Sequence, residues 1–220
     1  MGKTRLTTEK SLLLVCGFYA FSRLVLYYWG IRFNTYTLIN FCQILDPQLL
    51  KNNLWQSIYH LHIQPPLFNL FIGAILKLFP VTYKLAFNWI YLVFGMILAC
   101  SMLMLMIRLN LPPLLCVILT CVFIARPAAI IYENWLFYDY PVTMLMCLSA
   151  LFLHRFFTSG STRVGFIFFC LICGVALIRN GFHLIWLLVC LCLPLYHFRK
   201  QTKRILALCC IPFALVIMVY

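Results

Sequence analysis

Eight runs of apolar residues, separated by short polar segments, fill most of this chain of 220 residues. A water-soluble domain of this length needs roughly a quarter of its residues charged to cover its surface. Here 10% are charged and 65% are hydrophobic, with only four acidic residues in all. Lipid must therefore cover most of the surface, and the sequence predicts an all-α integral membrane protein with about seven to eight hydrophobic helices. The runs occupy positions 11–30, 67–80, 85–107, 111–131, 137–157, 164–178, 182–198 and 205–220.

The basic residues, which give a net charge of +13, gather at the ends of these runs. They are most frequent before the first run and between the last two: Lys3, Arg5, Lys10, Arg199, Lys200, Lys203 and Arg204. This pattern is typical of loops on the cytoplasmic side of a membrane. We therefore expect a cytoplasmic N-terminus at 1–10 and a polytopic membrane domain at 11–220, in a bacterial inner membrane or an endoplasmic-reticulum-type membrane. No basic stripe with interleaved aromatic residues lies outside the runs, which argues against nucleic acid as a partner.

Eleven of the twelve cysteines lie inside the apolar runs, where cysteine behaves as a small hydrophobic residue. Only Cys42 lies in a polar loop, and Cys170-x-x-Cys173 falls on a helix expected to lie in lipid. The cysteines therefore predict neither a disulfide framework nor a zinc site.

A long connector at 31–66, placed outside by a cytoplasmic N-terminus, separates the first two runs. Asp46-Pro47 is a good helix start, with the aspartate as cap and the proline in the first turn. Apolar residues then recur at helical spacing: Leu49, Leu50, Leu54, Ile58 and Leu61. This predicts an amphipathic helix that lies flat on the membrane or, as the alternative, an ordinary loop helix.

The charges also predict the topology. They place the connector 31–66 and the turns at 132–140 and 179–183 on the outer face, where we expect them to converge. Three apolar runs separate the connector from the turn at 132–140, so one of them cannot cross. We expect 67–80 to be that run, because 14 residues at about 1.5 Å each reach only about 21 Å of the roughly 30 Å hydrocarbon core.

Ionisable groups at the membrane edge usually mark function. Arg32, directly after the first run, either binds a phosphate or extends its charge to the interface. His60 and His62 are spaced to suit a divalent metal, for which Asp46 or Glu133 would supply a third ligand. Substrate hydrogen bonding and a simple interfacial position are the alternatives for both histidines.

Two carboxylates, Glu133 and Asp139, lie among large aromatic residues and suit a metal, a sugar hydroxyl or a proton. Arg179, on the next outer turn, is available to pair with either acid, Glu133 or Asp139, or with an anionic ligand. These considerations give three candidate catalytic residues: Asp46, Glu133 and Asp139. The candidate substrate-binding residues are Arg32, Asn34, His60, His62, Gln64, Asn134, Arg179 and His183.

The order of these features resembles the glycosyltransferase C superfamily. Gln64-Pro65-Pro66-Leu67-Phe68 resembles the His-Pro-Pro-Leu element of its dolichyl-phosphate-mannose and lipid A aminoarabinose-transferase-like branches. The stretch from Ala125-Arg126-Pro127 to Tyr132-Glu133-Asn134-Trp135 resembles the second outer loop, where these enzymes carry an acidic residue. The resemblance covers about residues 11–200.

The resemblance implies a membrane enzyme that moves a sugar from a polyprenyl-phosphate donor to an acceptor at the outer face. Asn34 stands near the position where that superfamily carries an acidic residue, and an amide is no general base. Either Asp46 takes that role or the protein is inactive. The last run ends at Tyr220 without a polar flank, which favours a truncated or degenerate member. A non-catalytic membrane protein, such as a transporter or an assembly factor, is the alternative.

Overall fold

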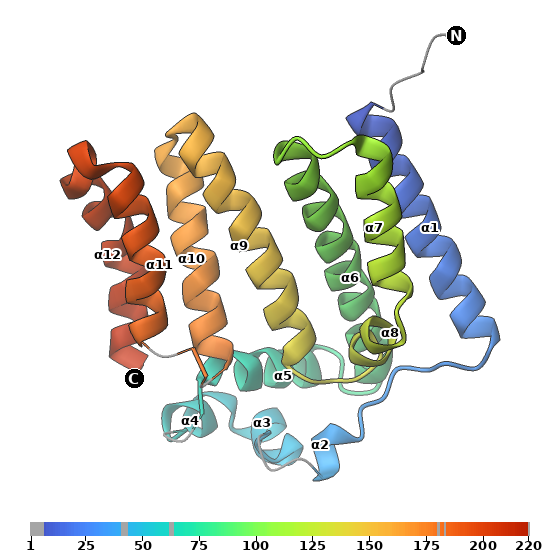
Figure 1. The fold of residues 1–220 in the computed structure, drawn as a ribbon. Coiled ribbons are helices and arrows are strands. Elements are labelled where there is room, and N and C mark those ends of the chain that lie inside the picture. The colour runs from blue at the N-terminus through green and yellow to red at the C-terminus, as the bar shows by residue number, and fades with distance from the viewer. Residues whose placement is uncertain (1–6, 41–43, 62–63, 180, 183, 220) are drawn as a thin grey trace, which may run out of the picture. The chain divides into compact units, whose positions relative to one another are not determined.

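The computed structural model describes residues 7–40, 44–61, 64–179, 181–182 and 184–219 (Figure 1). These residues form helices and connecting segments, with one isolated bridge between Asn34 and Trp135. The all-α prediction is therefore confirmed. The chain divides into two compact units, which are described separately: the first within 1–35 and 87–151, the second within 36–86 and 152–220.

The first unit contains α1, most of α6, α7, α8 and the first part of α9. Their bounds are Thr8–Tyr28, Tyr83–Arg108, Pro113–Ala125, Pro127–Glu133 and Asp139–Ser159. α1 packs against α7, and the core between α1, α6 and α7 includes Val15, Tyr19, Ala99, Leu103 and Cys116.

A sharp bend of 61° separates α7 from α8. Pro127 has no N–H to donate, and its ring pushes the preceding residue out of the helical region. Arg126 accordingly has φ −64° and ψ 139°, which is extended backbone. The apolar run at 111–131 therefore forms a broken helix instead of a continuous one.

The second unit contains the helices of the connector together with α10, α11 and α12. Its elements are α2 (Thr37–Asn40), α3 (Pro47–Asn52), α4 (Leu54–Tyr59), α5 (Pro66–Leu78), α10 (Thr162–Ile178), α11 (Leu184–His197), the 3-10 helix η1 (Arg199–Gln201) and α12 (Thr202–Val219). The core between α10, α11 and α12 includes Phe168, Phe169, Ile172, Leu187 and Ile205. α5 packs against α3, α4 and α10, and Figure 1 shows α5 crosswise to α10, at the end where α10 finishes.

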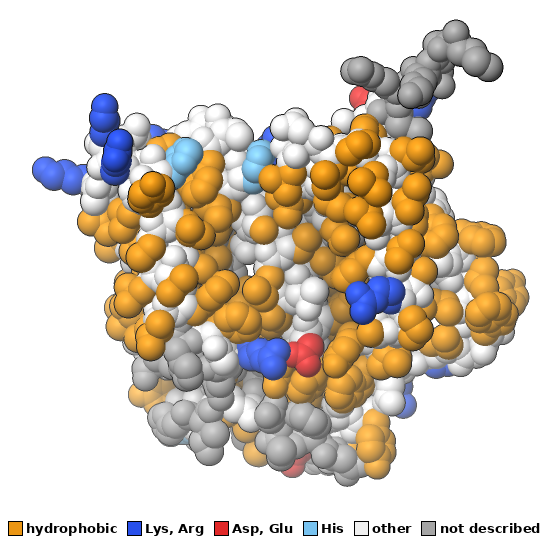
Figure 2. All heavy atoms as spheres, in the orientation of Figure 1, with side chains coloured by type: hydrophobic (Ala, Val, Ile, Leu, Met, Phe, Trp, Pro, Cys, Tyr) orange, Lys and Arg blue, Asp and Glu red, His pale blue; other side chains and the backbone are white. Residues whose placement is uncertain are grey.

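Four helical segments in the described part of the chain are long and apolar enough to cross a membrane: Thr8–Tyr28, Tyr83–Arg108, Asp139–Ser159 and Arg199–Val219. The bent pair α7 and α8 makes up to five, and α5, α10 and α11 are shorter apolar helices. Large side chains such as Leu13, Phe21 and Leu24 are more than half exposed on α1, and Figure 2 shows hydrophobic atoms over the outer surfaces of the helices. The protein is thus an integral membrane protein. Of the predicted seven to eight hydrophobic helices, four, or five with the bent pair, are long enough to span a membrane.

The connector differs from its prediction in one respect. Asp46 caps α3 as expected, because its Oδ1 accepts the N–H of Gln48 at 2.8 Å and Pro47 occupies the first turn. The expected single helix, however, is two short ones, since Asn53 has φ −126° and ψ 47° between them. Leu50 and Leu54 are buried, whereas the polar Lys51, Asn52 and Gln56 are exposed, so the pair of helices is amphipathic.

Candidate functional site

A buried ion pair is the most completely bonded polar feature of the first unit. Arg23 Nε donates to Glu133 Oε1 at 2.7 Å, and Arg23 Nη2 donates to Oε2 at 2.7 Å. The two side chains are only 9% and 1% exposed. This bidentate geometry fixes the orientation of the two side chains relative to each other as well as pairing their charges, because two guanidinium nitrogens donate to separate carboxylate oxygens.

Neighbouring groups complete the bonding of both partners. The Tyr140 hydroxyl donates to Glu133 Oε2 at 2.6 Å. Arg23 Nη1 donates to the Ile124 carbonyl at 3.1 Å and to Ser22 Oγ at 3.0 Å. The Ile124 carbonyl lies in the last turn of α7, where helical carbonyls lack an intrahelical donor. Arg23 therefore joins α1 both to the end of α7 and to the end of α8.

Gly95 on α6 makes room for this cluster. A Cβ atom at Gly95 would lie 2.2 Å from the Tyr19 hydroxyl, 2.6 Å from Glu133 Oε2 and 2.7 Å from the Tyr140 hydroxyl. Tyr19 also stacks under the guanidinium of Arg23, at 4.4 Å, and donates to the Leu92 carbonyl at 2.9 Å. A side chain at position 95 would displace groups that are each fixed by a hydrogen bond.

These contacts revise the interpretation of Glu133. Its carboxylate accepts three hydrogen bonds and is buried, which fits a structural ion pair and leaves no face open to a substrate. The partner of Glu133 is Arg23, whereas Arg179 was one of the alternatives that the sequence left open. Arg23 was missed as a functional residue, although an arginine inside an apolar run is itself a signal that an acidic partner lies nearby.

The start of the connector lies beside the segment that follows α8. The Asn34 N–H donates to the Asn134 carbonyl at 2.7 Å, and the Leu136 N–H donates to the Asn34 carbonyl at 3.0 Å. The structure thus brings Asn34 and Asn134 together through their backbones. The end of α1 and the end of α8 therefore lie at the same end of the first unit, and their position on the outer membrane face stays a prediction.

Arg32 closes the end of α1. Its guanidinium donates to the carbonyls of Tyr27 and Ile31 and lies over the Tyr27 ring at 3.8 Å. A cation at the C-terminus of a helix stabilises the unpaired carbonyls there. Of the two interpretations given above, this geometry favours an interfacial capping role over phosphate binding.

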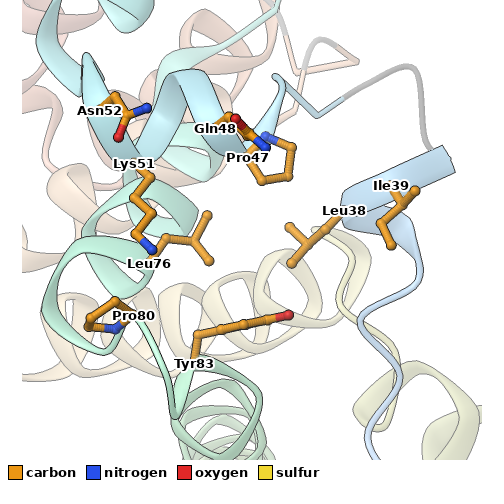
Figure 3. Close-up of a pocket in the computed structure, with 9 residues that line it drawn as sticks. All are labelled: Leu38, Ile39, Pro47, Gln48, Lys51, Asn52, Leu76, Pro80 and Tyr83. Carbon is orange, nitrogen blue, oxygen red and sulfur yellow. The ribbon is translucent and has the colours of Figure 1, made fainter.

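The second unit contains a pocket of about 430 Å³, formed by α2, α3, the end of α5 and the segment that leads into α6 (Figure 3). Nine residues line it: Leu38, Ile39, Pro47, Gln48, Lys51, Asn52, Leu76, Pro80 and Tyr83. In Figure 3 the Lys51 side chain extends from α3 toward Leu76 and Pro80.

The lining combines one cation with two amides and an apolar wall. Lys51 is its charged member, and Gln48 and Asn52 supply the amides. Asp46, the residue before Pro47, does not line the pocket; it is exposed, and its Oδ1 caps α3. A cation beside apolar side chains suits an amphiphilic anion, because the phosphate-like end needs a donor and the hydrocarbon end needs an apolar surface.

No protein-family model, curated protein or solved structure matches this chain. The assignment of a function therefore rests on the residues and their geometry.

The remaining candidate residues lie at element ends. His60 caps the C-terminus of α4 and contacts the Tyr59 ring edge-on at 5.3 Å. Arg179 caps α10, and Asp139 begins α9, where its carbonyl accepts the Thr143 hydroxyl at 2.8 Å. Gln64 lies just before α5 and is partly exposed. His62 and His183 lie outside the described residues.

Within the ranges described, no group of three or more His, Cys, Asp or Glu side chains is arranged to hold a metal ion. The predicted metal site at His60 and His62 depends on a residue outside those ranges. Glu133, one of its two proposed third ligands, is already bound by Arg23.

Proposed function

We propose that this protein is a membrane glycosyltransferase-like enzyme that takes a sugar from a polyprenyl-phosphate donor and transfers it to an acceptor at the outer membrane face. The observation that carries the proposal is the Lys51 pocket in the connector helices. It joins a cation, amides and an apolar wall in one cavity of about 430 Å³. The resemblance of the Gln64–Phe68 element to that superfamily supports the same assignment.

The donor fits the pocket by chemistry. A polyprenyl-phosphate sugar has a charged phosphate between a hydrocarbon chain and a polyhydroxylated ring. Lys51 would pair with the phosphate, Leu76 and Leu38 would contact the hydrocarbon, and Gln48 or Asn52 would hydrogen-bond the sugar. Arg179 is the second candidate cation for the phosphate.

Transfer breaks the bond between the anomeric carbon and the phosphate oxygen and forms a bond from that carbon to the acceptor oxygen. The polyprenyl phosphate leaves with the electron pair, so a nearby cation such as Lys51 stabilises the departing charge. The acceptor hydroxyl loses its proton, and Asp46, whose sequence neighbours Pro47 and Gln48 line the pocket, is the candidate base that accepts it. Asp139 is the second candidate base, whereas the bonding of Glu133 assigns it to the scaffold.

Binding of decaprenyl phosphate to the detergent-solubilised full chain tests the proposal. Lys51→Ala should weaken binding about tenfold or more, since a hydrogen bond to a charged group contributes about 1.5–3 kcal/mol. Lys77→Ala, which removes an exposed lysine of α5 that does not line the pocket, is the matched control and should bind like the parent.

The substitution Asp46→Asn separates the proposed role of Asp46 as a general base from its role as the N-cap of α3. Asparagine caps helices about as well as aspartate does, so the variant should fold and bind the donor like the parent. Loss of sugar transfer with binding retained would support the proposed role.

The alternative is a non-catalytic membrane protein. The burial of Glu133 in an ion pair favours it, because the acidic residue of the second outer loop then serves the fold. If the well-folded parent binds no decaprenyl phosphate, the transferase proposal is overturned and this alternative stands.

A further inference from the structure

Two connections at one end of the second unit are joined by a single arginine. Arg204 Nη2 donates to Thr162 Oγ1 at 2.7 Å and also to the Gly160 carbonyl. Its Nη1 donates to Gln201 Oε1 at 2.7 Å. The turn between α9 and α10 is thereby fixed to the connection between α11 and α12. We call the surface formed by residues 160–163 and 199–204 the basic platform.

Four further cations of the basic platform are exposed: Arg163, Arg199, Lys200 and Lys203. No hydrogen bond or ion pair joins these four side chains to another residue of the described ranges. Figure 2 shows Lys and Arg side chains projecting from this end of the second unit. The platform therefore presents positive charge whose partner must come from outside the unit.

The sequence of the second unit cannot supply that partner. Among residues 36–86 and 152–220 the only acidic side chain is Asp46, which caps α3 at the other end of the unit (Figure 1). Charges separated by more than a Debye length of about 8 Å are largely screened. The excess charge thus remains concentrated at the platform.

The surroundings of the platform identify the kind of anion. Tyr196, at the end of α11, is 84% exposed, and Leu206, in the first turns of α12, is 46% exposed. Apolar and aromatic side chains that face outward next to a ring of cations are typical of the level at which lipid headgroups meet hydrocarbon. A nucleic acid or a soluble acidic protein would have to approach this surface through the headgroup layer.

We propose that the basic platform binds the headgroups of anionic phospholipids. The phosphate oxygens accept hydrogen bonds from the guanidinium of Arg163 or Arg199 and from the ammonium groups of Lys200 and Lys203. Arg204 orders the two connections before the lipid binds, so the cations converge on one headgroup layer without a folding cost. This inference is independent of the proposed enzymatic function.

The experiment compares two double variants of the full chain in nanodiscs made of phosphatidylcholine with 20% phosphatidylglycerol. Lys200→Gln with Lys203→Gln removes two platform cations. Lys77→Gln with Lys84→Gln removes two exposed lysines of the same unit outside the platform. The measurement is the ratio of phosphatidylglycerol to phosphatidylcholine that remains bound after extraction, by native mass spectrometry.

The parent and the Lys77/Lys84 variant should retain phosphatidylglycerol preferentially, and the Lys200/Lys203 variant should lose about 30-fold in preference. That figure assumes about 1 kcal/mol, or fivefold, for each cation near an anionic surface. The bound phosphatidylglycerol of the parent should also fall as salt rises from 50 to 500 mM, which tests the proposal without any substitution.

Equal loss in both double variants, or retention that salt does not change, would overturn the proposal. Displacement of the lipid from the parent by millimolar inorganic phosphate would show a site for free phosphate, and it would overturn the lipid assignment as well.

Discussion

At the scale of single residues, the first unit depends on one charge pair placed between helices. A hydrogen bond to a charged group contributes about 1.5–3 kcal/mol. Removal of one member of a buried ion pair costs about 3–5 kcal/mol, because the remaining charge stays buried without a partner. The bidentate contact between Arg23 and Glu133 therefore outweighs the single contact from Tyr140.

We expect Arg23→Met and Glu133→Gln each to lower the midpoint of thermal unfolding in detergent strongly. Tyr140→Phe should lower it less than either of these, since the ion pair stays intact. The double variant Arg23→Met with Glu133→Gln should recover much of the loss, since neither charge is then left alone. If Glu133→Gln abolished activity and kept the midpoint of the parent, the structural interpretation of Glu133 would be wrong.

Gly95→Ala should also destabilise the first unit, by about 1–3 kcal/mol, because the added methyl group overlaps fixed polar atoms. The nearest of them, the Tyr19 hydroxyl, would lie 2.2 Å from the new Cβ. Gly17→Ala is the control on α1, where the structure places nothing within 4 Å of a new Cβ. It should be neutral or slightly stabilising, since alanine favours the helix over glycine. Equal unfolding midpoints for the two variants would contradict the packing described for Gly95.

The pairing of Arg23 with Glu133 could be predicted from the sequence only in part. Arg23 is an ionisable residue inside an apolar run, which signals an acidic partner, but the sequence prediction assigned it none of the chain's four acidic residues. The choice among them depended on the bend at Arg126, which turns α8 so that Glu133 reaches α1. A bend is signalled by Pro127, but its direction depends on the packing of α7 against α1 and is not encoded in local residues.

At the scale of elements, the connector is the part that the sequence described best. Asp46-Pro47 identified the start of α3, because capping is a local interaction between a side chain and the next two residues. The break at Asn53 was not predicted. It lets Leu50 and Leu54 both pack on α5 near Gly73, a long-range contact that no local pattern specifies.

α5 provides a test at this scale. With 13 residues at about 1.5 Å each it is about 20 Å long, short of the roughly 30 Å core. Cysteines introduced at Gln64 and Phe79, which flank α5, should therefore react with a membrane-impermeant maleimide from the same side. Val81→Cys and Leu109→Cys flank the 26-residue α6 and should react from opposite sides. Reaction of the α5 pair from opposite sides would show that this helix crosses the membrane.

At the scale of the whole molecule, the predicted convergence of three segments can be compared only with the contacts inside each unit. In the first unit the start of the connector lies beside the segment after α8, through the hydrogen bonds of Asn34. In the second unit α5, at the end of the connector, packs against α10, and Figure 1 shows α5 at the end where α10 finishes. The convergence of all three segments at one outer face remains a prediction.

Labelling at Asn53, Tyr132 and Gly181 tests that prediction in cells. These positions represent the connector and the two turns, and each is exposed. All three cysteine variants should react from outside, and Leu109→Cys should react only after permeabilisation if the N-terminus is cytoplasmic. Tyr140 is unsuitable as a labelling site because it is only 5% exposed. Labelling of the three positions from different sides would contradict the topology.

The pair formed by Arg23 and Glu133 has a consequence for biosynthesis. The two residues are 110 positions apart, so the ribosome completes α1 long before it makes the carboxylate that neutralises its arginine. At a typical synthesis rate of about 5–20 residues per second, that interval lasts roughly 5–20 seconds. During it α1 contains an uncompensated charge that disfavours release into lipid. We therefore expect α1 to remain in the insertion machinery until α8 emerges, and a substitution that delays α8 to prolong that retention.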